Sequence, residues 1–475
     1  MYICNYILKS ILSMILLLSF AKNAFSQEKI DDIEVIGISP LPGIEIDRNK
    51  IPNASQSLRE IDLDSSTGTT IVDLLGEKLT GVTIKDVQNS PFQKNIDYRG
   101  FTAAPLLGES QGLAVYLNGT RINEGFGDTL QWELVPEAAL TNIDLMSSNP
   151  VFGLNALGGS LALTTKKGLD FLNTDSSVEN HFEFGGADWV NGNIELGAGD
   201  ESQGLYVAME NSYDGGWRDN SAGDVKRLFI NYGKIFENSD FDFTFMNADS
   251  NLNGNGVSPT ELLKVRRESV FTWPDFTSNK VYLAASNANF YLEDDSVINT
   301  SVYYRRLIRD TLNADELDAE ECAEDNATHA EQLEDDFGTA DEPICGEADG
   351  DNYEVLIDQF GNAISNNDAI RKYGLLNKSS TMTVTWGGSA QYNINTNYLD
   401  KMHNIIIGAS VDKTRTAFHS RGELGQLHNN RTVTNLLNTE GGFITLESIR
   451  EHDGTDGGME DSNERGDVGS AQLAS

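Results

Sequence analysis

The stretch Phe241-Asp242-Phe243-Thr244-Phe245-Met246 places an aromatic side chain at every second position. Alternation with a period of two indicates a β-strand with one apolar face, because successive side chains of a strand point to opposite sides of a sheet. Similar alternation occurs around Phe182, Leu205 and Ile405, in segments joined by Gly, Asn and Asp residues. We therefore predict a series of antiparallel strands after about residue 168.

Strands of roughly ten residues with one apolar and one polar face are typical of a transmembrane β-barrel. A soluble β-sandwich gives the same pattern in single strands. Aromatic residues near the segment ends, long polar connections and a predicted export signal favour the barrel.

The composition excludes several classes of protein. The chain has 475 residues, with 34 Lys+Arg against 73 Asp+Glu and a formal net charge of −39. This charge argues against a nucleic-acid binder and against a basic membrane-surface anchor, since both need an excess of cations. A mean hydropathy of −0.35 argues against a helical membrane protein.

Residues 1–26 read as a signal peptide. Lys9 precedes an apolar run from Ile11 to Ala21, and small residues at Ala24 and Ser26 form a cleavage pattern. The run is too short to span a bilayer as a helix. We therefore expect an exported chain, which can be periplasmic, secreted or, if the strands form a barrel, inserted in the outer membrane of a Gram-negative bacterium.

Residues 310–351 contain 17 Asp or Glu and no Lys or Arg. Such a segment repels itself, so we predict a solvated loop. Cys322 and Cys345 remain after signal cleavage, and in an exported chain they predict one disulfide. Asp349-Gly350-Asp351-Asn352 does not fit an EF-hand, so we predict no metal site here and favour the solvated loop over divalent-cation binding.

Residues 41–168 read as a compact mixed α/β domain. Apolar residues in Thr70–Leu79 occupy one helical face, Thr70 and Asp73 stand at capping-box spacing, and Gly81 ends the helix. Leu113–Leu117 leads into Asn118-Gly119, a strong hairpin signal, and Thr120-Arg121-Ile122 returns.

Three motifs in this domain resemble the plug of the TonB-dependent receptors of bacterial outer membranes. In chain order they are Ile96-Asp97-Tyr98-Arg99-Gly100-Phe101, then Val115-Tyr116-Leu117-Asn118-Gly119-Thr120-Arg121, and then Ile143-Asp144-Leu145 followed by Asn149-Pro150, Phe152-Gly153, Ala156-Leu157-Gly158-Gly159 and Thr164-Thr165-Lys166. The resemblance implies a mixed α/β plug domain at 41–168 followed by a transmembrane antiparallel β-barrel, which has 22 strands in the family. Residues 169–475 would be the N-terminal part of that barrel.

Residues 27–40 hold a short β-prone stretch between an acidic flank and two prolines. By itself it reads equally well as a strand that adds to a partner's sheet edge or as the first strand of the next domain. The family implies a TonB box that couples the receptor to TonB of the inner-membrane complex. The box residues are Asp32, Ile33, Glu34, Val35, Ile36 and Gly37.

The resemblance implies energised uptake of a scarce, bulky solute, with a ferric siderophore as the first expectation. Cobalamin, haem or another nutrient is the alternative ligand, and a passive porin, an adhesin or a non-functional truncated barrel is the alternative class. We find no catalytic motif and predict no enzyme, no cofactor, no nucleic-acid partner and a monomer in contact with outer-membrane lipid.

The family assigns two roles to plug residues. Arg99 and Arg121 stand in motifs that face barrel carboxylates, which predicts plug retention, although exposed hairpin arginines would be the plainer interpretation. Ligand contacts come from plug apices, and ordinary loop packing is the plainer alternative for each candidate. The candidates are Phe101, Gln111, Asn123, Phe126, Asp128 and Trp132.

The length after position 168 conflicts with a whole barrel. Twenty-two strands of about 9–11 residues need roughly 200–240 residues before any connection is counted. The acidic loop occupies many of the 307 residues that remain, and we place nine or ten strands. We therefore expect a truncated sequence that cannot close a plugged barrel.

Overall fold

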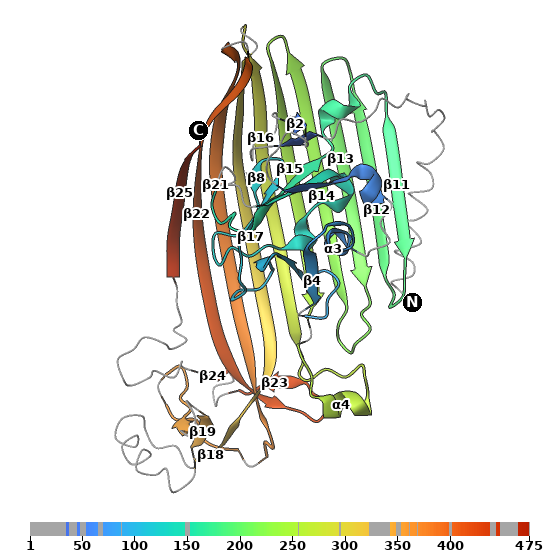
Figure 1. Cartoon of the computed structure of the whole chain (residues 1–475). Coiled ribbons are helices and arrows are strands. Elements are labelled where there is room, and N and C mark those ends of the chain that lie inside the picture. Colours follow the sequence, from blue (N-terminus) through green and yellow to red (C-terminus); the bar gives the residue numbers. More distant parts are fainter. Residues whose placement is uncertain are drawn as a thin grey trace.

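The computed structural model describes residues 35–37, 45–47, 54–64, 70–86, 88–147, 153–254, 256–293, 296–322, 343–347, 353–360, 362–367, 369–398, 401–437, 443–446 and 464–474. A mixed α/β unit lies against the inner side of one large curved sheet (Figure 1). We call the unit from β3 (Ser55–Arg59) to β10 (Gly159–Thr165) the plug, and the sheet that begins at β11 (Ser177–Phe184) the wall.

The wall contains twelve strands, and nine of them, from β11 to β22, pair in chain order. Each neighbouring pair among these nine is antiparallel. The bounds after β11 are β12 (Val190–Gly199), β13 (Gln203–Asp214), β14 (Gly223–Phe236), β15 (Ser239–Asn253), β16 (Asp275–Tyr291), β17 (Val297–Leu317), β21 (Tyr373–Tyr398) and β22 (Lys401–Leu427). The shorter strands β23 (Val433–Asn435), β24 (Thr445–Leu446) and β25 (Glu464–Ala474) pair with β22.

The predicted alternation sets the two faces of the wall. In β15, Phe243 is 40% exposed on the outer side, whereas Met246 is buried on the inner side. The outward face of β15 is therefore apolar from Phe241 to Phe245, as lipid contact requires, and the plug covers the inward face. The predicted fold class, a plug followed by an incomplete antiparallel barrel, is confirmed, and the β-sandwich alternative is wrong because one curved sheet replaces two stacked ones.

The two ends of the wall differ. Short turns join β12 to β13 and β14 to β15, whereas long connections follow β15 and β17 and carry α4 (Thr260–Val265), β18 (Ala319–Glu321), β19 (Ile344–Glu347) and β20 (Tyr353–Val355). These elements lie together at the bottom of Figure 1. In transmembrane barrels short turns face the periplasm and long loops face outward. We call the two ends the turn end and the loop end.

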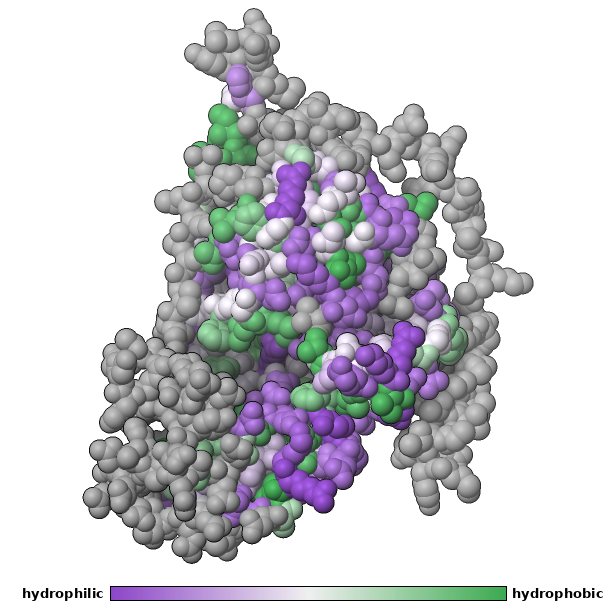
Figure 2. Space-filling view, turned by 60° about the horizontal axis from the view of Figure 1, so that its bottom comes forward, coloured by the Kyte–Doolittle hydropathy of each residue, from purple (hydrophilic) through white to green (hydrophobic). Residues whose placement is uncertain are grey.

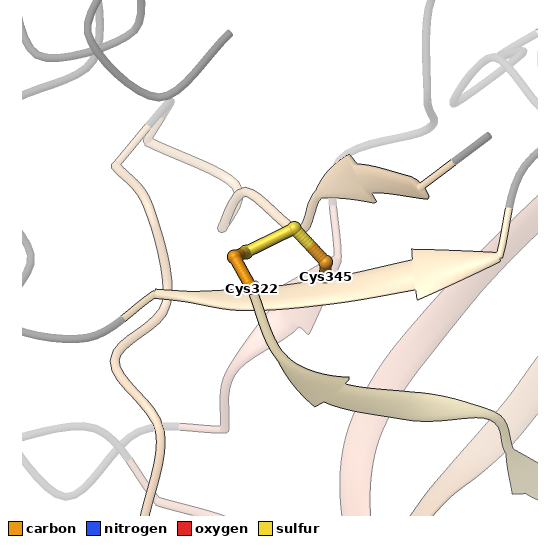
Figure 3. The surroundings of a disulfide bond; sticks show 2 residues. All are labelled: Cys322 and Cys345. Carbon is orange, nitrogen blue, oxygen red and sulfur yellow. A yellow bond between two sulfur atoms is a disulfide. The ribbon is translucent and has the colours of Figure 1, made fainter. Parts of the chain in front are cut away.

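The acidic segment is more ordered than its composition predicts. β17 continues through Asp310 to Leu317, so the boundary predicted at 310 is wrong, and β18, β19 and β20 form a small sheet. Cys322 and Cys345 form a disulfide within it (Figure 3). Ile344 of the small sheet packs with Tyr373 of β21. The acidic segment has few apolar residues of its own, and the wall supplies the ones that it packs against. The residue pattern within the segment cannot reveal such distant contacts.

The plug is built on two small sheets. The larger has the order β3-β9-β10-β7-β8, with β7 and β10 parallel, and the smaller pairs β5 with β4 and β6. The bounds are β4 (Val82–Asp86), β5 (Lys94–Tyr98), β6 (Phe101–Ala103), β7 (Leu113–Leu117), β8 (Thr120–Arg121) and β9 (Leu140–Ser147). The helical elements are α2 (Glu60–Asp64), α3 (Ile71–Lys78), η2 (Trp132–Leu134) and η3 (Glu137–Ala139), with η5 (Gly168–Phe171) leading into the wall.

Local signals in the plug act as predicted. The Thr70 side chain accepts a hydrogen bond from the Asp73 backbone N–H and caps α3, and Gly81 takes a φ of 81° beyond its end. Asn118 and Gly119 both have positive φ, as a tight hairpin between β7 and β8 requires.

The predicted TonB box is described only at Val35–Gly37. These residues form β1, which pairs antiparallel with β2 (Glu45–Asp47) in a separate two-stranded sheet. Asp32, Ile33 and Glu34 lie outside the described residues, as does the predicted signal peptide at 1–26. None of the helices in the described part of the chain is long and apolar enough to cross a membrane.

Candidate functional site

A buried arginine of the wall holds the plug. Arg227 of β14 pairs with Glu137 of η3, with 2.9 Å between Nη2 and Oε1, and with Glu210 of β13, with 2.9 Å between Nη1 and Oε2. Its Nε donates to the backbone oxygen of Glu133 at 2.6 Å. The Arg227 side chain is 3% exposed. One guanidinium therefore joins two elements of the plug to two strands of the wall.

The Glu133 carboxylate of η2 also faces the wall. Its Oε1 accepts a hydrogen bond from Asn279 Nδ2 at 2.7 Å and one from Ser250 Oγ at 3.3 Å. Both donors lie toward the loop end of their strands. The η2 segment of the plug is thus fixed against β15 and β16.

A second arginine contact lies on β17. Arg305 pairs with Glu124, which follows β8 of the plug, and both side chains are buried. Four residues further along the same face, Arg309 Nη1 donates to the backbone oxygen of Pro105 at 2.8 Å. The cations of these plug contacts therefore belong to the wall.

Burial changes the proton affinity of the plug carboxyls. Loss of water raises the pKa of Glu124, Glu133 and Glu137 above their ordinary values. The guanidinium of Arg305 opposes the shift of the Glu124 pKa, and that of Arg227 opposes the shift of the Glu137 pKa. The attachment of the plug is therefore linked to pH.

Neither Arg99 nor Arg121 forms an ion pair with a carboxylate of the described wall, so their predicted role in plug retention stays a prediction. Arg99 is exposed and stacks over the Tyr98 ring, 4.9 Å from its centroid. Arg121 pairs with Asp128 of the plug itself. The two buried arginines that reach the plug, Arg227 and Arg305, belong to the wall. At the end of β10 the sense is opposite, since Lys166 pairs with Glu195 of β12 at 2.7 Å.

A cavity of about 350 Å³ lies between the plug and strands β17, β21 and β22. The plug contributes Arg121, Asn123 and Asp128, together with two loop leucines. The wall contributes hydroxyl and carboxylate groups: Tyr303, Thr385, Asp412 and Thr414. Tyr303 donates its hydroxyl proton to Asp412 across the wall. The lining combines these hydrogen-bonding groups with apolar surface, to which Leu154 and Leu157 contribute, and such a mixture is usual in ligand-binding pockets.

Three of the six predicted ligand residues lie at or beside this cavity. Asn123 and Asp128 line it, and Phe126 lines a small adjoining pocket that shares Glu124 with it. Phe126 is 41% exposed and its ring lies 5.6 Å from that of Phe418 on β22. Asn123 also holds the backbone of β7, since its Oδ1 accepts from the Val115 N–H at 2.8 Å.

The other three predicted ligand residues pack inside the plug. Trp132 is 1% exposed and donates from Nε1 to the Ala103 backbone oxygen at 3.0 Å. Gln111 bonds the backbone of Ala104 through both ends of its amide. Phe101 packs against Gly158 and Gly112. Each of these three side chains makes a structural contact within the plug, and the ligand role predicted for them stays a prediction.

The sequence interpretation missed a second meeting point of plug and wall at the loop end. Trp217, in the connection between β13 and β14, donates from Nε1 to Asn89 Oδ1 in the plug at 3.1 Å. Its exposed ring lies 5.1 Å from the Arg267 guanidinium carbon. A further contact joins Phe92 of the plug to Trp189, which precedes β12, with 5.4 Å between the stacked ring centroids. Figure 2 shows this end, where hydrophilic residues predominate on the described surface. No local pattern pairs residues 128 positions apart.

Metal ligands do not gather in the described residues: no group of three or more His, Cys, Asp or Glu side chains there is placed to hold an ion. The Cys322–Cys345 pair is joined as a disulfide and leaves no free thiolate in it.

Comparison with known proteins gives a family match for the plug and a likeness of fold for the whole chain. Residues 47–160 match the family model "TonB-dependent Receptor Plug Domain". No curated protein sequence matches the chain. Among solved structures, the chain resembles the ferripyoverdine receptor of the outer membrane of Pseudomonas aeruginosa, at 12% identity and a TM-score of 0.57, over 93% of this chain and 50% of that one.

Two further structures show the same fold. The ferric preacinetobactin receptor from Acinetobacter baumannii matches at 9% identity and a TM-score of 0.54, over 90% of this chain and 54% of that one. The ferric citrate transporter FecA matches at 13% identity and a TM-score of 0.56, over 82% and 51%. The chain thus spans about half the length of the receptors that it matches.

Proposed function

Because this chain carries the plug domain of a TonB-dependent receptor inside part of that family's barrel, we propose that it serves the energised uptake of a scarce, bulky solute across the bacterial outer membrane. Members of this family are transporters and not enzymes. The proposed partner is TonB, and the proposed setting is the outer membrane of a Gram-negative bacterium after export by the signal peptide.

One observation carries the proposal: the plug occupies the inner side of the wall, while the chain before it forms a separate strand pair. β1 and β2 form their own two-stranded sheet, so each strand keeps one edge without a described neighbour. An edge strand offers backbone donors and acceptors to a strand of a partner protein. TonB can add to β1 there and pull on the chain that leads into β3 of the plug.

The cavity supports a solute rich in oxygen and nitrogen atoms. Arg121 and Asp128 on the plug and Thr385 and Thr414 on the wall all offer polar groups to it. We propose a ferric siderophore as this solute, because an iron chelate presents carbonyl and hydroxyl groups at its periphery. The solved receptors described above are named for ferric chelates, which agrees with this choice.

The test is uptake of radioactive ferric iron by iron-starved cells that express this gene in place of their own copy. The iron is supplied as complexes with chelators extracted from the culture medium. In the Val35→Pro variant the strand loses a backbone donor, so uptake should fall to the level of cells without the gene. Val35→Ala is the matched control, because it keeps the donor and should retain uptake.

Each other outcome points to one alternative. Undiminished uptake in Val35→Pro cells, or in cells treated with an uncoupler, contradicts energised transport and supports a passive porin. Energised uptake of labelled cobalamin or haemin, without uptake of the iron complexes, supports the transport proposal but contradicts the ferric siderophore as its ligand. Normal outer-membrane insertion without uptake of any of these probes contradicts the transport proposal.

A further inference from the structure

The cavity between the plug and the wall has more acids than cations in its lining. The described lining includes three carboxylates, those of Glu124, Asp128 and Asp412, and one guanidinium, that of Arg121. Arg305 of β17 pairs with Glu124 from outside the lining and raises the number of cations to two. Three acids against two cations leave one negative charge in excess among these groups.

Asp412 of β22 accounts for this excess, because the two plug carboxylates of the lining each pair with an arginine. Asp412 accepts a hydrogen bond from the Tyr303 hydroxyl, which is a neutral donor. In the strand registers its neighbours are Gly387 of β21 and Ser470 of β25, and positions 468 and 472 of β25 are uncharged as well. Lys413, the next residue, points to the outward face, because successive side chains of a strand alternate.

The contact between Tyr303 and Asp412 is built into the wall at a glycine. Gly387 lies between the two residues in the strand registers of β17, β21 and β22. A Cβ on Gly387 would collide with Asp412 Oδ1 and would lie 2.7 Å from Tyr303 Cε1. The missing side chain therefore leaves room for a carboxylate and an aromatic ring side by side at the cavity. Both groups attract a cation, the carboxylate by its charge and the ring by its π-electrons.

The plug adds apolar surface to the same cavity. Leu154 and Leu157 line it and are 46% and 64% exposed. On the wall, the hydroxyls of Thr385 and Thr414 lie 3.0 Å apart, in the row of the sheet next to Asp412. A solute that fits both surfaces has a cationic nitrogen at the end of a chain of methylene groups. The cavity volume of about 350 Å³ has room for such an aminoalkyl arm.

We propose that this cavity selects an iron chelate with a primary ammonium group on an alkyl arm, which binds Asp412 through the ammonium and the two leucines through its methylene groups. An ammonium has three N–H donors, and Asp412, Thr385 and Thr414 supply acceptors for them. A chelate that turns a carboxylate toward Asp412 is disfavoured, because like charges repel. The inference rests on the proposed function, since it names the class of solute bound at that same site.

The test compares two iron complexes that differ by one charge. The first is the ferric complex of desferrioxamine B, a linear trihydroxamate that ends in a primary amine. The second is the same complex with that amine acetylated. Equilibrium dialysis of the radioactive complexes against the purified full chain in detergent measures binding without energised uptake. The amine form should bind about tenfold more tightly, which corresponds to one hydrogen bond between charged groups.

The Asp412→Asn variant should lose this preference, because a neutral amide of the same size replaces the carboxylate. It should bind the amine form about tenfold more weakly and the acetylated form with unchanged affinity. Two control variants should keep the preference. Tyr303→Phe retains the carboxylate and the ring, and Asp240→Asn removes a carboxylate that accepts from Asn289 outside the described lining of the cavity. Circular dichroism in detergent checks that each variant folds.

The outcomes separate this inference from the transport proposal. Equal binding of the two complexes by the unmodified chain, or binding of neither, would overturn the inference without any variant. A preference for the amine form that survives Asp412→Asn would also overturn it, since another group would then recognise the charge. Energised uptake of ferric citrate by cells that do not take up the amine complex contradicts the inference and leaves transport intact. The expected binding without energised uptake supports the inference and contradicts the transport proposal.

Discussion

Arg227 on β14 and Glu137 on η3 are 90 residues apart in the chain and form a buried ion pair with 2.9 Å between Nη2 and Oε1. Glu210 shares the same guanidinium. The plug is therefore attached to the wall through charges that lie away from water, where a charge without its partner is costly.

Removing Arg227 should destabilise the attachment of the plug strongly. In Arg227→Met the carboxylates of Glu137 and Glu210 lose their shared cation, so we expect a loss of about 3–5 kcal/mol. Urea unfolding of the detergent-solubilised chain, followed by tryptophan fluorescence, measures it. Lys226→Met is the control, because Lys226 is exposed and should change stability by less than about 0.5 kcal/mol. Equal midpoints in the two variants would contradict the role of Arg227.

Arg305 and Glu124 should show coupling in a double-mutant cycle. Each single variant, Arg305→Met or Glu124→Gln, leaves the other group buried without its partner. The double variant should therefore lose about 1–3 kcal/mol less unfolding free energy than the two single variants lose together. The measurement is the same urea unfolding. Additive single effects would mean that the two side chains do not stabilise one another.

Stability should fall as the pH rises. Burial raises the pKa of Glu124, Glu133 and Glu137, so the folded chain binds protons more tightly than the unfolded chain does. Their contribution is complete below the ordinary glutamate pKa, about 4.3, and is lost as the pH rises through the raised values. Calorimetric unfolding midpoints, recorded from mildly acidic to mildly alkaline pH, measure how steeply stability falls with pH.

The Glu124→Gln variant isolates this effect. Repulsion among the carboxylates of a chain with a net charge of −39 also lowers stability as the pH rises. The informative quantity is therefore the difference between the variant and the unmodified chain in how steeply the unfolding midpoint falls with pH. The unfolding midpoint of the variant should fall less steeply with rising pH than that of the unmodified chain. A steeper loss in the variant would contradict the raised pKa of Glu124.

Gly158→Ala should destabilise the plug. A Cβ at this position would lie 2.4 Å from carbon atoms of the Phe101 ring, so the ring must move. We expect a cost of about 1–3 kcal/mol in unfolding free energy. Gly186→Ala is the control, because a Cβ added there would meet nothing within 4 Å, and it should be close to neutral. A neutral Gly158→Ala would show that Phe101 is not packed there.

Loss of the disulfide should loosen the small sheet at the loop end and leave the wall intact. Cys322 and Cys345 are 23 residues apart, and closing a loop of this size contributes about 3 kcal/mol in the chain-entropy model. In the variant Cys322→Ser, Cys345→Ser, limited proteolysis should cut between these positions faster, while protease-resistant wall fragments keep their size. Unchanged cleavage rates would show that β18 and β19 hold together without the bond.

The sequence by itself determined the local structure. Thr70 predicted the start of α3, Asn118-Gly119 predicted the hairpin, and the alternation in Phe241–Met246 predicted a strand with one apolar face. These features depend on hydrogen bonds and side-chain directions within a few residues, so a linear pattern contains them. The order of three motifs also located the plug, which the family match confirms.

Only the tertiary structure decided which charges meet. Arg121 turns to Asp128 of its own domain, and the plug is held by Arg227 and Arg305, which no motif marked. Trp132 reads as a candidate ligand contact but is buried at 1% exposure. Ion pairs and burial depend on where distant strands bring their side chains, and that position follows from the packing of the plug in the wall. The sequence names the groups, and the fold determines which of them lose water and find a partner.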